Sequence, residues 1–329
     1  MRPDVRRWFE RRTSAAADWP LATLLDAKHR RDTGPLTVSV VLPALDEART
    51  IGPIVEAIHG ELVAGCGLVD ELVVIDSGSG DGTASVAAAA GATVLAHQDV
   101  LPELGTRDGK GEALWKSLHA TTGDVLVFVD ADLLDFDARF VTGLLGPLLT
   151  DPAVGFVKAT YDRALDTGAT VLPAGGGRVT ELVARPLLDL HWPRLAGFVQ
   201  PLAGEYAGRR DVLERLPFVC GYGVELAMLI DLLDLVGLDA LAQVDLGRRA
   251  HRNRDDAALG RMAAAIWCTA LGRLTSEGRL SMTTGPAPAL TQFERADGGY
   301  AAVTTEVEVH ERPPMLSVPG YARRRAAAS

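Results

Sequence analysis

Strands and helices alternate along most of this 329-residue chain, and this alternation constrains the fold more than any other feature. Short β-branched runs, each followed by a turn and a helical pattern, are typical of parallel βαβ units. The clearest run is Thr37 to Pro43 (TVSVVLP), which has the character of a buried strand and ends at a proline. Further strands are predicted over 71–76, 92–96, 125–130 and 154–160. The chain is therefore expected to adopt an α/β fold, with helices flanking a mostly parallel sheet.

The segments between these runs have the apolar spacing of helices. In 51–62, apolar residues recur every three or four positions and form one face. Helices are likewise predicted over 83–90, 111–120, 136–149, 179–190, 222–235 and 257–274, with a short strand at 242–246. After residue 275 we expect mostly loop, with an edge strand at 303–309. Residues 1–36 are polar and basic, and they are predicted to form an arm with one helix.

Composition excludes several classes of protein. A formal charge of −10 argues against nucleic-acid binding through the overall field, although a local arginine cluster can still bind an anion. The three cysteines (Cys66, Cys220, Cys268) lack metal-site spacing and favour a reducing compartment. No apolar run reaches the length of about 18 residues that a membrane span needs, and the N-terminus lacks the apolar core of a signal peptide. We therefore expect a cytoplasmic protein with no membrane span.

Polar residues follow three predicted strands, at 43–47, 76–79 and 130–132, where open parallel sheets bind ligands. Asp130 and Asp132 are two positions apart, so in an extended segment both carboxylates point to the same side. Two adjacent carboxylates need a proton or a cation, and a divalent ion that also binds a diphosphate is the usual solution. The simpler alternative is that Asp132 or Asp135 caps the following helix.

Two glycine-rich segments could bind a nucleotide. The segment 76–83 (DSGSGDGT) links a strand to a helix and allows close backbone approach, although Asp81 or Thr83 could simply cap that helix. The segment 105–111 (GTRDGKG) is one residue too short for a P-loop, and Lys110 is followed by glycine rather than by serine or threonine. Lys110 remains a candidate point charge for a phosphate.

These motifs together resemble a known family. In order, VVLPALDE, VVIDSGSGDGT, GKGEALW and VFVDADL resemble the nucleotide-sugar half of a GT-A glycosyltransferase. GGGRVTELVARPLL, QPLAGEY, GYGVELAMLID and RAHRN then resemble the glucosyl-3-phosphoglycerate synthases, the retaining enzymes of glycosyltransferase family 81. The similarity spans roughly 38–253, with a weaker match in the ERPPM segment of the tail. It implies a GT-A fold in four regions, namely an N-terminal arm (1–36), a nucleotide-sugar-binding half (37–172), an acceptor-binding and metal-completing half (173–275) and a C-terminal tail (276–329).

The resemblance also implies an activity, transfer of glucose from UDP-glucose to the 2-hydroxyl of 3-phosphoglycerate with retention of configuration. It implies a divalent cofactor, Mg²⁺ or alternatively Mn²⁺ or another divalent ion, bound by Asp132 and His251. The donor would be bound by Pro43, Ala44, Leu45, Glu47, Asp76, Ser77, Lys110, Asp130, Ala131, Tyr222 and Glu225. The acceptor would be bound by Gly177, Arg178, Val179, Thr180, Arg249 and Asn253. Lys110, Asp132 and Glu225 would be the catalytic groups. A homodimer and a role in methylglucose lipopolysaccharide biosynthesis are implied as well.

The residues themselves support part of this assignment. Gly175 to Gly177 precede a predicted helix, so free N–H groups and the positive end of the helix dipole offer an anion site. Arg178 adds a guanidinium suited to a carboxylate or phosphate. Simpler alternatives are a flexible hinge with a surface arginine, and a surface His251 among basic neighbours. Glu225 could merely favour a helix dipole, and Tyr222 could be a packed aromatic.

Two positions depart from the family pattern, since Asp46 stands where Asn is expected and Ala131 where Ser is expected. Neither change removes a charged group. No carboxylate stands out as a covalent nucleophile, which favours attack on the face that the departing UDP occupies. The metal and Lys110 would offset the charge that develops on UDP. Two alternatives stay open, a related transferase using GDP-mannose or glycerate, and a non-catalytic protein that binds a nucleotide sugar.

Overall fold

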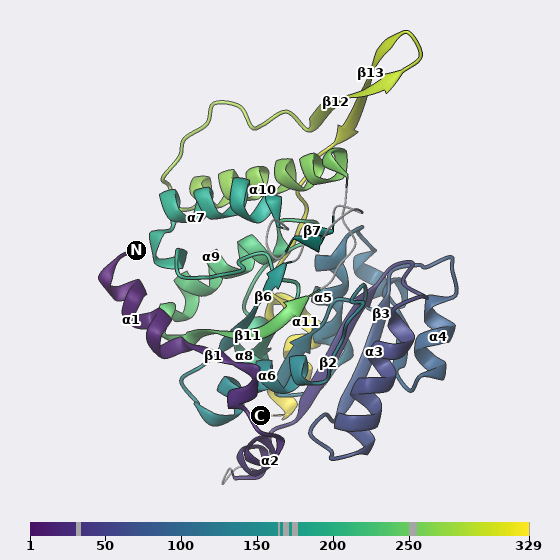
Figure 1. Ribbon diagram of the computed structural model, residues 1–329, viewed down its shortest axis with the longest axis vertical. Coiled ribbons are helices and arrows are strands. Elements are labelled where there is room, and N and C mark those ends of the chain that lie inside the picture. Colours follow the sequence, from purple (N-terminus) through teal and green to yellow (C-terminus); the bar gives the residue numbers. More distant parts are fainter. Residues whose placement is uncertain (31–33, 164, 167–170, 173–176, 250–254, 329) are drawn as a thin grey trace.

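A computed structural model describes residues 1–30, 34–163, 165–166, 171–172, 177–249 and 255–328. Its centre is an eight-stranded sheet with the order β1-β11-β6-β9-β5-β2-β3-β4 (Figure 1). Neighbouring strands are parallel except at β9, which runs antiparallel to both β5 and β6. The strand bounds are β1 Thr13–Ala15, β2 Val38–Ala44, β3 Glu71–Asp76, β4 Thr93–Ala96, β5 Val125–Phe128, β6 Phe156–Arg163, β9 Tyr206–Arg209 and β11 Leu241–Arg249. The predicted α/β fold with a mostly parallel sheet is confirmed.

Helices cover both faces of this sheet. One apolar core joins it to α1, α5, α7, α9, α10 and α11, and a second joins it to α2, α3, α4 and α6. Along β5, Leu126 and Phe128 enter the first core, while Val125 and Val127 enter the second, as alternation along a strand requires. The helix bounds are α1 Pro3–Arg12, α2 Leu21–His29, α3 Ile51–Ile58, α4 Thr83–Ala89, α5 Lys110–Ala120, α6 Arg139–Thr150, α7 Arg185–His191, α8 Arg210–Leu213, α9 Val224–Val236, α10 Asp256–Ser276 and α11 Pro319–Ala328.

Most predicted elements are present, with shifted ends. The helix predicted over 51–62 is α3 followed by a π-helical turn, η2 (His59–Ala64). The helix predicted from residue 136 starts only at Arg139, whose backbone N–H donates to the Asp137 carboxylate at 2.8 Å. The strand predicted to residue 130 ends at Phe128. No helix in the described part of the chain combines the length and the apolar character that crossing a bilayer requires.

The N-terminal arm contains more structure than the one helix predicted. It holds both α1 and α2, and β1 joins the main sheet beside β11. Val5 and Trp8 of α1 are fully buried, and the Trp8 indole donates to the Leu241 carbonyl at 2.7 Å. These two apolar residues suffice to hold a helix that is otherwise polar, which is why its composition did not reveal it.

The prediction of a mostly loop C-terminal tail is wrong. β12 (Ala289–Ala296) and β13 (Gly299–Glu306) form an antiparallel hairpin that projects from the body at the top of Figure 1. The predicted edge strand thus falls largely within β13. The tail also supplies α11 and β14 (Glu311–Arg312), which pairs with β10 (Phe218–Val219). The remaining strands are the short pair β7 (Leu165–Asp166) and β8 (Val171–Leu172).

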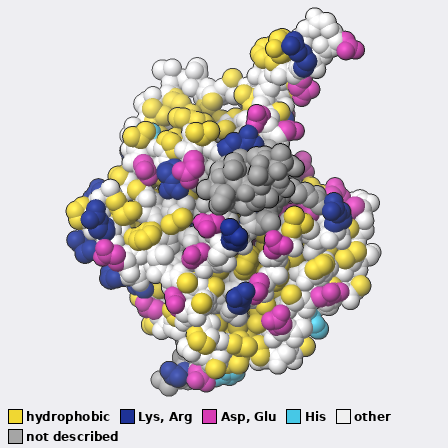
Figure 2. All heavy atoms as spheres, in the orientation of Figure 1, with side chains coloured by type: hydrophobic (Ala, Val, Ile, Leu, Met, Phe, Trp, Pro, Cys, Tyr) yellow, Lys and Arg dark blue, Asp and Glu magenta, His cyan; other side chains and the backbone are white. Residues whose placement is uncertain are grey.

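Exposed hydrophobic side chains gather near this hairpin. Figure 2 shows them over α7 and α10, below the projecting strands. Leu182 is 74% exposed and Leu190 76%, while Trp267 on α10 is 48% exposed. On the hairpin itself, Phe293 and Tyr300 are 70% and 71% exposed. Exposed apolar side chains that lie together are a feature of interaction surfaces.

Candidate active site

Two loops at the carboxyl ends of β2 and β3 are held together by hydrogen bonds. Pro43 and Ala44 end β2, and the Ser77 N–H donates to the Ala44 carbonyl at 2.9 Å. The Asp46 N–H donates to Ser79 Oγ at 2.9 Å. The backbone at Asp46 has a φ of +55°, a left-handed conformation that asparagine and aspartate tolerate best. Aspartate in place of the family's asparagine is therefore compatible with this turn.

Most residues of these loops that were predicted to bind the donor lie at the carboxyl ends of the strands. Leu45 is 55% exposed, and Glu47 is half-buried. Asp76 ends β3 nearly buried, where its carboxylate accepts Ser79 Oγ–H at 2.5 Å and the Gly78 N–H at 3.2 Å. Asp76 thus closes its own loop, and its contact with a donor stays a prediction. The Asp81 carboxylate accepts the Thr83 N–H at 3.0 Å just before α4, although Gly82 is the N-cap residue and no side-chain bond caps this helix.

Lys110 joins the predicted catalytic residue Glu225 to Asp130, which was predicted to bind the donor. It is the first residue of α5, and its Nζ donates to Asp130 Oδ1 at 2.5 Å and to Glu225 Oε1 at 3.1 Å. Asp130 follows β5, and Glu225 lies in the first turn of α9. A Cβ atom on Gly204 would lie 1.9 Å from Asp130 Oδ2, which explains a glycine in the QPLAGEY motif. Tyr222, just before α9, is 46% exposed.

Arg249 bridges the two aspartates. Its Nη2 donates to Asp130 Oδ2 at 3.0 Å and to Asp132 Oδ1 at 3.1 Å, and Nη1 donates to the Tyr161 hydroxyl at 2.7 Å. Arg249 was predicted as an acceptor ligand, and that role stays a prediction because here it neutralises Asp130 and Asp132. Burial opposes ionisation of Asp130, but Lys110 and Arg249 outweigh it and hold the pKa of Asp130 well below its usual range.

Asp132 has the properties of a metal ligand. Its side chain is 33% exposed, and its second carboxylate oxygen has no hydrogen-bond partner among the described residues. Such an oxygen suits Mg²⁺ or Mn²⁺. The alternative role of Asp132 or Asp135 as a helix cap is wrong, since α6 begins only at Arg139 and has no side-chain cap bond. In the described part of the chain no group of three His, Cys, Asp or Glu side chains converges on one point. The predicted second ligand, His251, lies outside the described residues, as does Asn253.

The predicted acceptor residues lie where α7 begins and next to α10. Gly177 has a φ of +79°, and its carbonyl accepts the Glu181 N–H at 3.0 Å. A π-helical turn, η5 (Thr180–Ala184), then continues into α7, which confirms the predicted helix. Arg178 forms an ion pair with Asp256 at the start of α10. Val179 is buried in the core, and the buried Thr180 Oγ1 has no hydrogen-bond partner in the part of the chain that the structure describes.

Sequence reasoning missed a layer of buried polar groups beneath the site. Glu205 is fully buried and contacts Arg249, with 3.1 Å between Oε1 and Nη1. Lys158 on β6 is also fully buried, with its Nζ 4.3 Å from the centre of the Tyr206 ring. The sequence does contain a signal for Lys158, since it stands between apolar and small residues in the first half of β6, whereas Glu205 lies just before β9.

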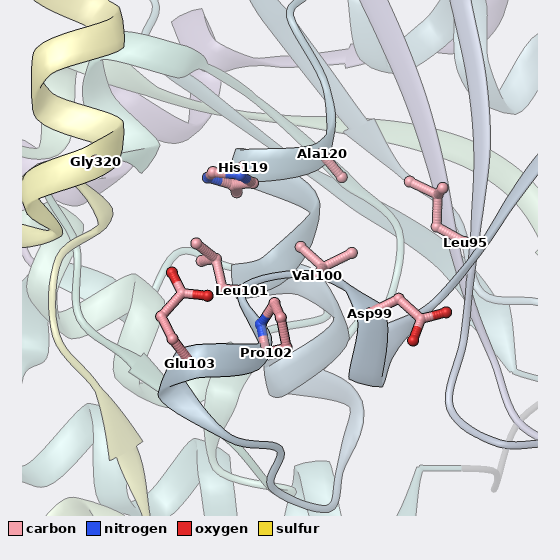
Figure 3. A pocket seen from close by; sticks show the side chains of 9 residues that line it. All are labelled: Leu95, Asp99, Val100, Leu101, Pro102, Glu103, His119, Ala120 and Gly320. Atoms are coloured by element: carbon pink, nitrogen blue, oxygen red, sulfur yellow. The ribbon is translucent and has the colours of Figure 1, made fainter.

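A cavity of about 440 Å³ lies elsewhere (Figure 3). It is lined by Leu95 of β4, by the turns at 99–103, and by His119 and Ala120 at the end of α5 opposite Lys110. None of the predicted site residues lines it. The candidate active site is therefore the ion cluster at the strand ends.

The fold is an α/β sheet with two aspartates after one of its strands and a lysine at the start of α5. Together with glycine-rich loops of the kind that bind nucleotides, this arrangement defines a GT-A glycosyltransferase. Comparison with known proteins agrees. The model of glycosyl transferase family 2 matches residues 39–215, and this chain belongs to that family, together with its glucosyl-3-phosphoglycerate synthase relatives.

Three relatives show how far the likeness extends. The glucosyl-3-phosphoglycerate synthase of Mycolicibacterium smegmatis is 47% identical over 312 residues, covering 95% of this chain and 98% of that protein. A crystal structure of the Mycobacterium tuberculosis synthase with Mn²⁺, UDP and phosphoglyceric acid is 45% identical, with a TM-score of 0.78, and covers 90% of this chain and 94% of that one. A crystal structure of mannosyl-3-phosphoglycerate synthase from Rubrobacter xylanophilus is 41% identical, with a TM-score of 0.86. The match covers 95% of this chain and 98% of that one.

Proposed function

We propose that this protein transfers glucose from UDP-glucose to the 2-hydroxyl of 3-phosphoglycerate, with retention of configuration and with the help of a divalent ion. The observation that carries the proposal is the cluster in which Lys110 joins Asp130 and Glu225, next to the partly exposed Asp132. It stands in a chain 47% identical to a glucosyl-3-phosphoglycerate synthase over nearly its whole length. Related structures contain Mn²⁺ with UDP-glucose and phosphoglyceric acid, or Mg²⁺ with UDP.

On this proposal the residues have distinct tasks on the donor side. The Lys110 ammonium, kept charged by Asp130 and Glu225, offsets negative charge on the departing diphosphate. Glu225 keeps one carboxylate oxygen for sugar hydroxyls. Asp132, with His251, would hold a divalent ion, which supplies further electrostatic stabilisation of the leaving group. The predicted uridine contacts come from the loops after β2 and β3.

On the acceptor side, the residues at the start of the η5–α7 helix are suited to binding an anion. Arg178 supplies a guanidinium, the Thr180 hydroxyl is buried without a partner among the described residues, and Gly177 permits close backbone approach. These groups would hold the phosphate or carboxylate of 3-phosphoglycerate. The division into 37–172 for the donor and 173–275 for the acceptor is part of this proposal, although β9 and β11 of the second region belong to the same sheet as the strands of the first.

The likeness to the Rubrobacter mannosyl-3-phosphoglycerate synthase, at a TM-score of 0.86, favours a second candidate, a transferase that uses GDP-mannose. Product analysis separates the candidates when UDP-glucose and GDP-mannose are each incubated with 3-phosphoglycerate or glycerate, with Mg²⁺ or with EDTA. We expect UDP-glucose and 3-phosphoglycerate to give glucosyl-3-phosphoglycerate, and only when Mg²⁺ is present. A mannosylated product at the higher rate would replace the donor assignment. Binding of UDP-glucose without turnover would favour a non-catalytic protein.

We also infer a cytoplasmic homodimer that acts in methylglucose lipopolysaccharide biosynthesis. Support for the dimer comes from the exposed apolar residues of α10 and the projecting β12–β13 hairpin, with Trp267, Phe293 and Tyr300 exposed. Light scattering on the purified protein should give twice the mass of 34.8 kDa. Changing Phe293 and Tyr300 together to Ser should shift it toward the monomer.

A further inference from the structure

The C-terminal segment 310–315, here called the strap, contacts two elements of the active site. β14 within it pairs with β10, matching Phe218 with Arg312 and Val219 with Glu311. The Cys220 N–H extends this pairing by donating to the His310 carbonyl at 2.9 Å. The strap is therefore joined to the strand that leads directly into Tyr222 and Glu225.

The side chain of Arg312 ties the strap to α5. Its Nε and Nη2 donate to the two oxygens of Glu112 at 2.7 and 2.8 Å, which is the paired fork that fixes both position and orientation. Nη1 and Nη2 also reach the Leu104 and Gly105 carbonyls, at 3.0 and 3.1 Å. Glu112 is fully buried, so it has no water to replace this partner. In return, the Trp115 indole of α5 donates to the Pro313 carbonyl at 2.8 Å.

The start of α5 also packs directly on β10. The Gly111 N–H donates to the Cys220 carbonyl at 2.7 Å. A Cβ atom on Gly111 would lie 1.9 Å from the Val219 carbonyl oxygen, so the two backbones are in close contact. Lys110 is the residue before Gly111, and Glu112 the residue after it. Any shift of Glu112 is consequently passed to Lys110 through two peptide units.

The other end of the strap is fixed to α9 and α10. Arg273 of α10 forms ion pairs with Glu311 of the strap and with Asp231 of α9. The strap thus contacts α5, which carries Lys110, and β10, the strand before α9. It reaches α9, which carries Glu225, through Arg273 of α10. Lys110 and Glu225 are hydrogen-bonded at 3.1 Å across this junction.

We propose that Arg312 is a positioning residue for glucosyl transfer, which acts through Glu112 and β10 to hold Lys110 and Glu225 in the geometry that the donor requires. This inference rests on the proposed function and adds to it a role for the C-terminal tail. For Arg312 it predicts a larger effect on the donor side than on the acceptor side, because the Arg312 side chain bonds to Glu112 of α5 and to the Leu104 and Gly105 carbonyls.

Arg312→Lys tests the fork with the least risk to folding, since it keeps a cation next to Glu112. A double variant, Arg312→Met with Glu112→Met, removes both charges. The buried Lys116, which lies 3.5 Å from Glu112, then keeps its bonds to the His97 carbonyl and to Thr106. Arg324→Lys is the matched control, because Arg324 is also a tail arginine bonded to α5, but it donates to the His119 carbonyl at the far end, at 2.7 Å. Steady-state turnover is measured per folded molecule, with folding checked by circular dichroism and thermal unfolding.

For Arg312→Lys we expect kcat to fall by about ten- to a hundredfold, the usual effect of displacing a reacting group by about 1 Å, together with a raised KM for UDP-glucose. The KM for 3-phosphoglycerate should stay within about twofold, and Arg324→Lys should change neither constant. Unchanged kcat per folded molecule would overturn the inference, whether or not the melting temperature falls. Equal changes in both KM values would do the same, since they indicate a general structural role.

Failure of the proposed function gives a different result. If the wild-type protein does not turn over UDP-glucose, the same variants are compared by calorimetry for binding of UDP-glucose and of 3-phosphoglycerate. The inference then requires weaker UDP-glucose binding by Arg312→Lys and unchanged 3-phosphoglycerate binding. Equal binding of UDP-glucose by both proteins would refute it independently of the reaction.

Discussion

Replacing Lys158 by methionine is expected to stabilise the fold at pH 7, although most changes to buried side chains destabilise. Lys158 is fully buried on β6, between β11 and β9, and its Nζ has no hydrogen-bond partner among the described residues. Burial lowers its pKa to about 7, and the nearby Glu225 carboxylate opposes this only in part. Methionine has a similar length and carries no charge to bury.

The magnitude follows from proton linkage. An unfolded chain binds the lysine proton with the ordinary pKa of 10.5, whereas the folded protein loses it near 7. The unfolded state therefore binds more protons between these values, and stability rises with pH across this window. The resulting penalty is about 4 kcal/mol at pH 7 and about 1.5 kcal/mol at pH 9.5. Lys158→Met should remove it, so its advantage over wild type should shrink by about 3 kcal/mol between these pH values.

Urea unfolding followed by tryptophan fluorescence, at pH 7 and at pH 9.5, measures this difference. The matched control is Lys28→Met, because Lys28 is also buried but its Nζ donates to the Gly67 and Leu68 carbonyls and to Asp70, at 2.8, 3.0 and 2.7 Å. That variant should be less stable than wild type at both pH values. The reasoning about Lys158 is refuted if Lys158→Met is also less stable at pH 7, or if its advantage is the same at pH 9.5.

Three further changes test the site. Asp132→Asn should lower turnover at least about a hundredfold at saturating Mg²⁺ without lowering the melting temperature, since it removes a metal-facing charge; normal rates would exclude Asp132 as a ligand. Arg178→Met should raise the KM for 3-phosphoglycerate by about tenfold or more and leave that for UDP-glucose unchanged, whereas a neutral effect would move the acceptor site elsewhere. Asp130→Asn should lower the melting temperature at pH 7, and the deficit should persist to about pH 4, because the lowered pKa of Asp130 keeps its stabilisation until strongly acidic pH; a deficit that vanishes by pH 6 would contradict this.

The central strands were predictable because burial on both faces leaves little choice of residue. β2, β3 and β5 are nearly continuous β-branched or apolar runs, and their predicted positions agree with the structure to within two residues. β9 (YAGR) and β1 (TSA) have no such composition. Each pairs with a stronger neighbour that dictates its conformation, which is a tertiary effect that no local pattern contains.

The candidate site was predictable where it follows the chain, and unpredictable where distant segments meet. Asp130 and Asp132 could be located because they directly follow a strand. The role of Arg249 could not be derived, since it lies 119 residues from Asp130 and reaches it only through the pairing of β11 with β6. Arg312 and Glu112, 200 residues apart, are a second example. Both arginines approach their carboxylates through strand registers that the sequence does not reveal.

The balance of charge at the site explains why the proposed diphosphate donor would bind together with a divalent cation. The carboxylates around the site are those of Asp130, Asp132, Glu205 and Glu225. The cations that contact them are Lys110 and Arg249, while Lys158, whose pKa burial lowers to about 7, adds little charge above neutral pH. Burial raises the pKa of Glu205, with Arg249 opposing, so that even with Glu205 protonated the carboxylates outnumber the cations among the described residues. Such a site repels a bare diphosphate. On the proposed function, a divalent cation at the partly exposed Asp132 would offset this repulsion, and the separate Arg178 would bind the anionic acceptor.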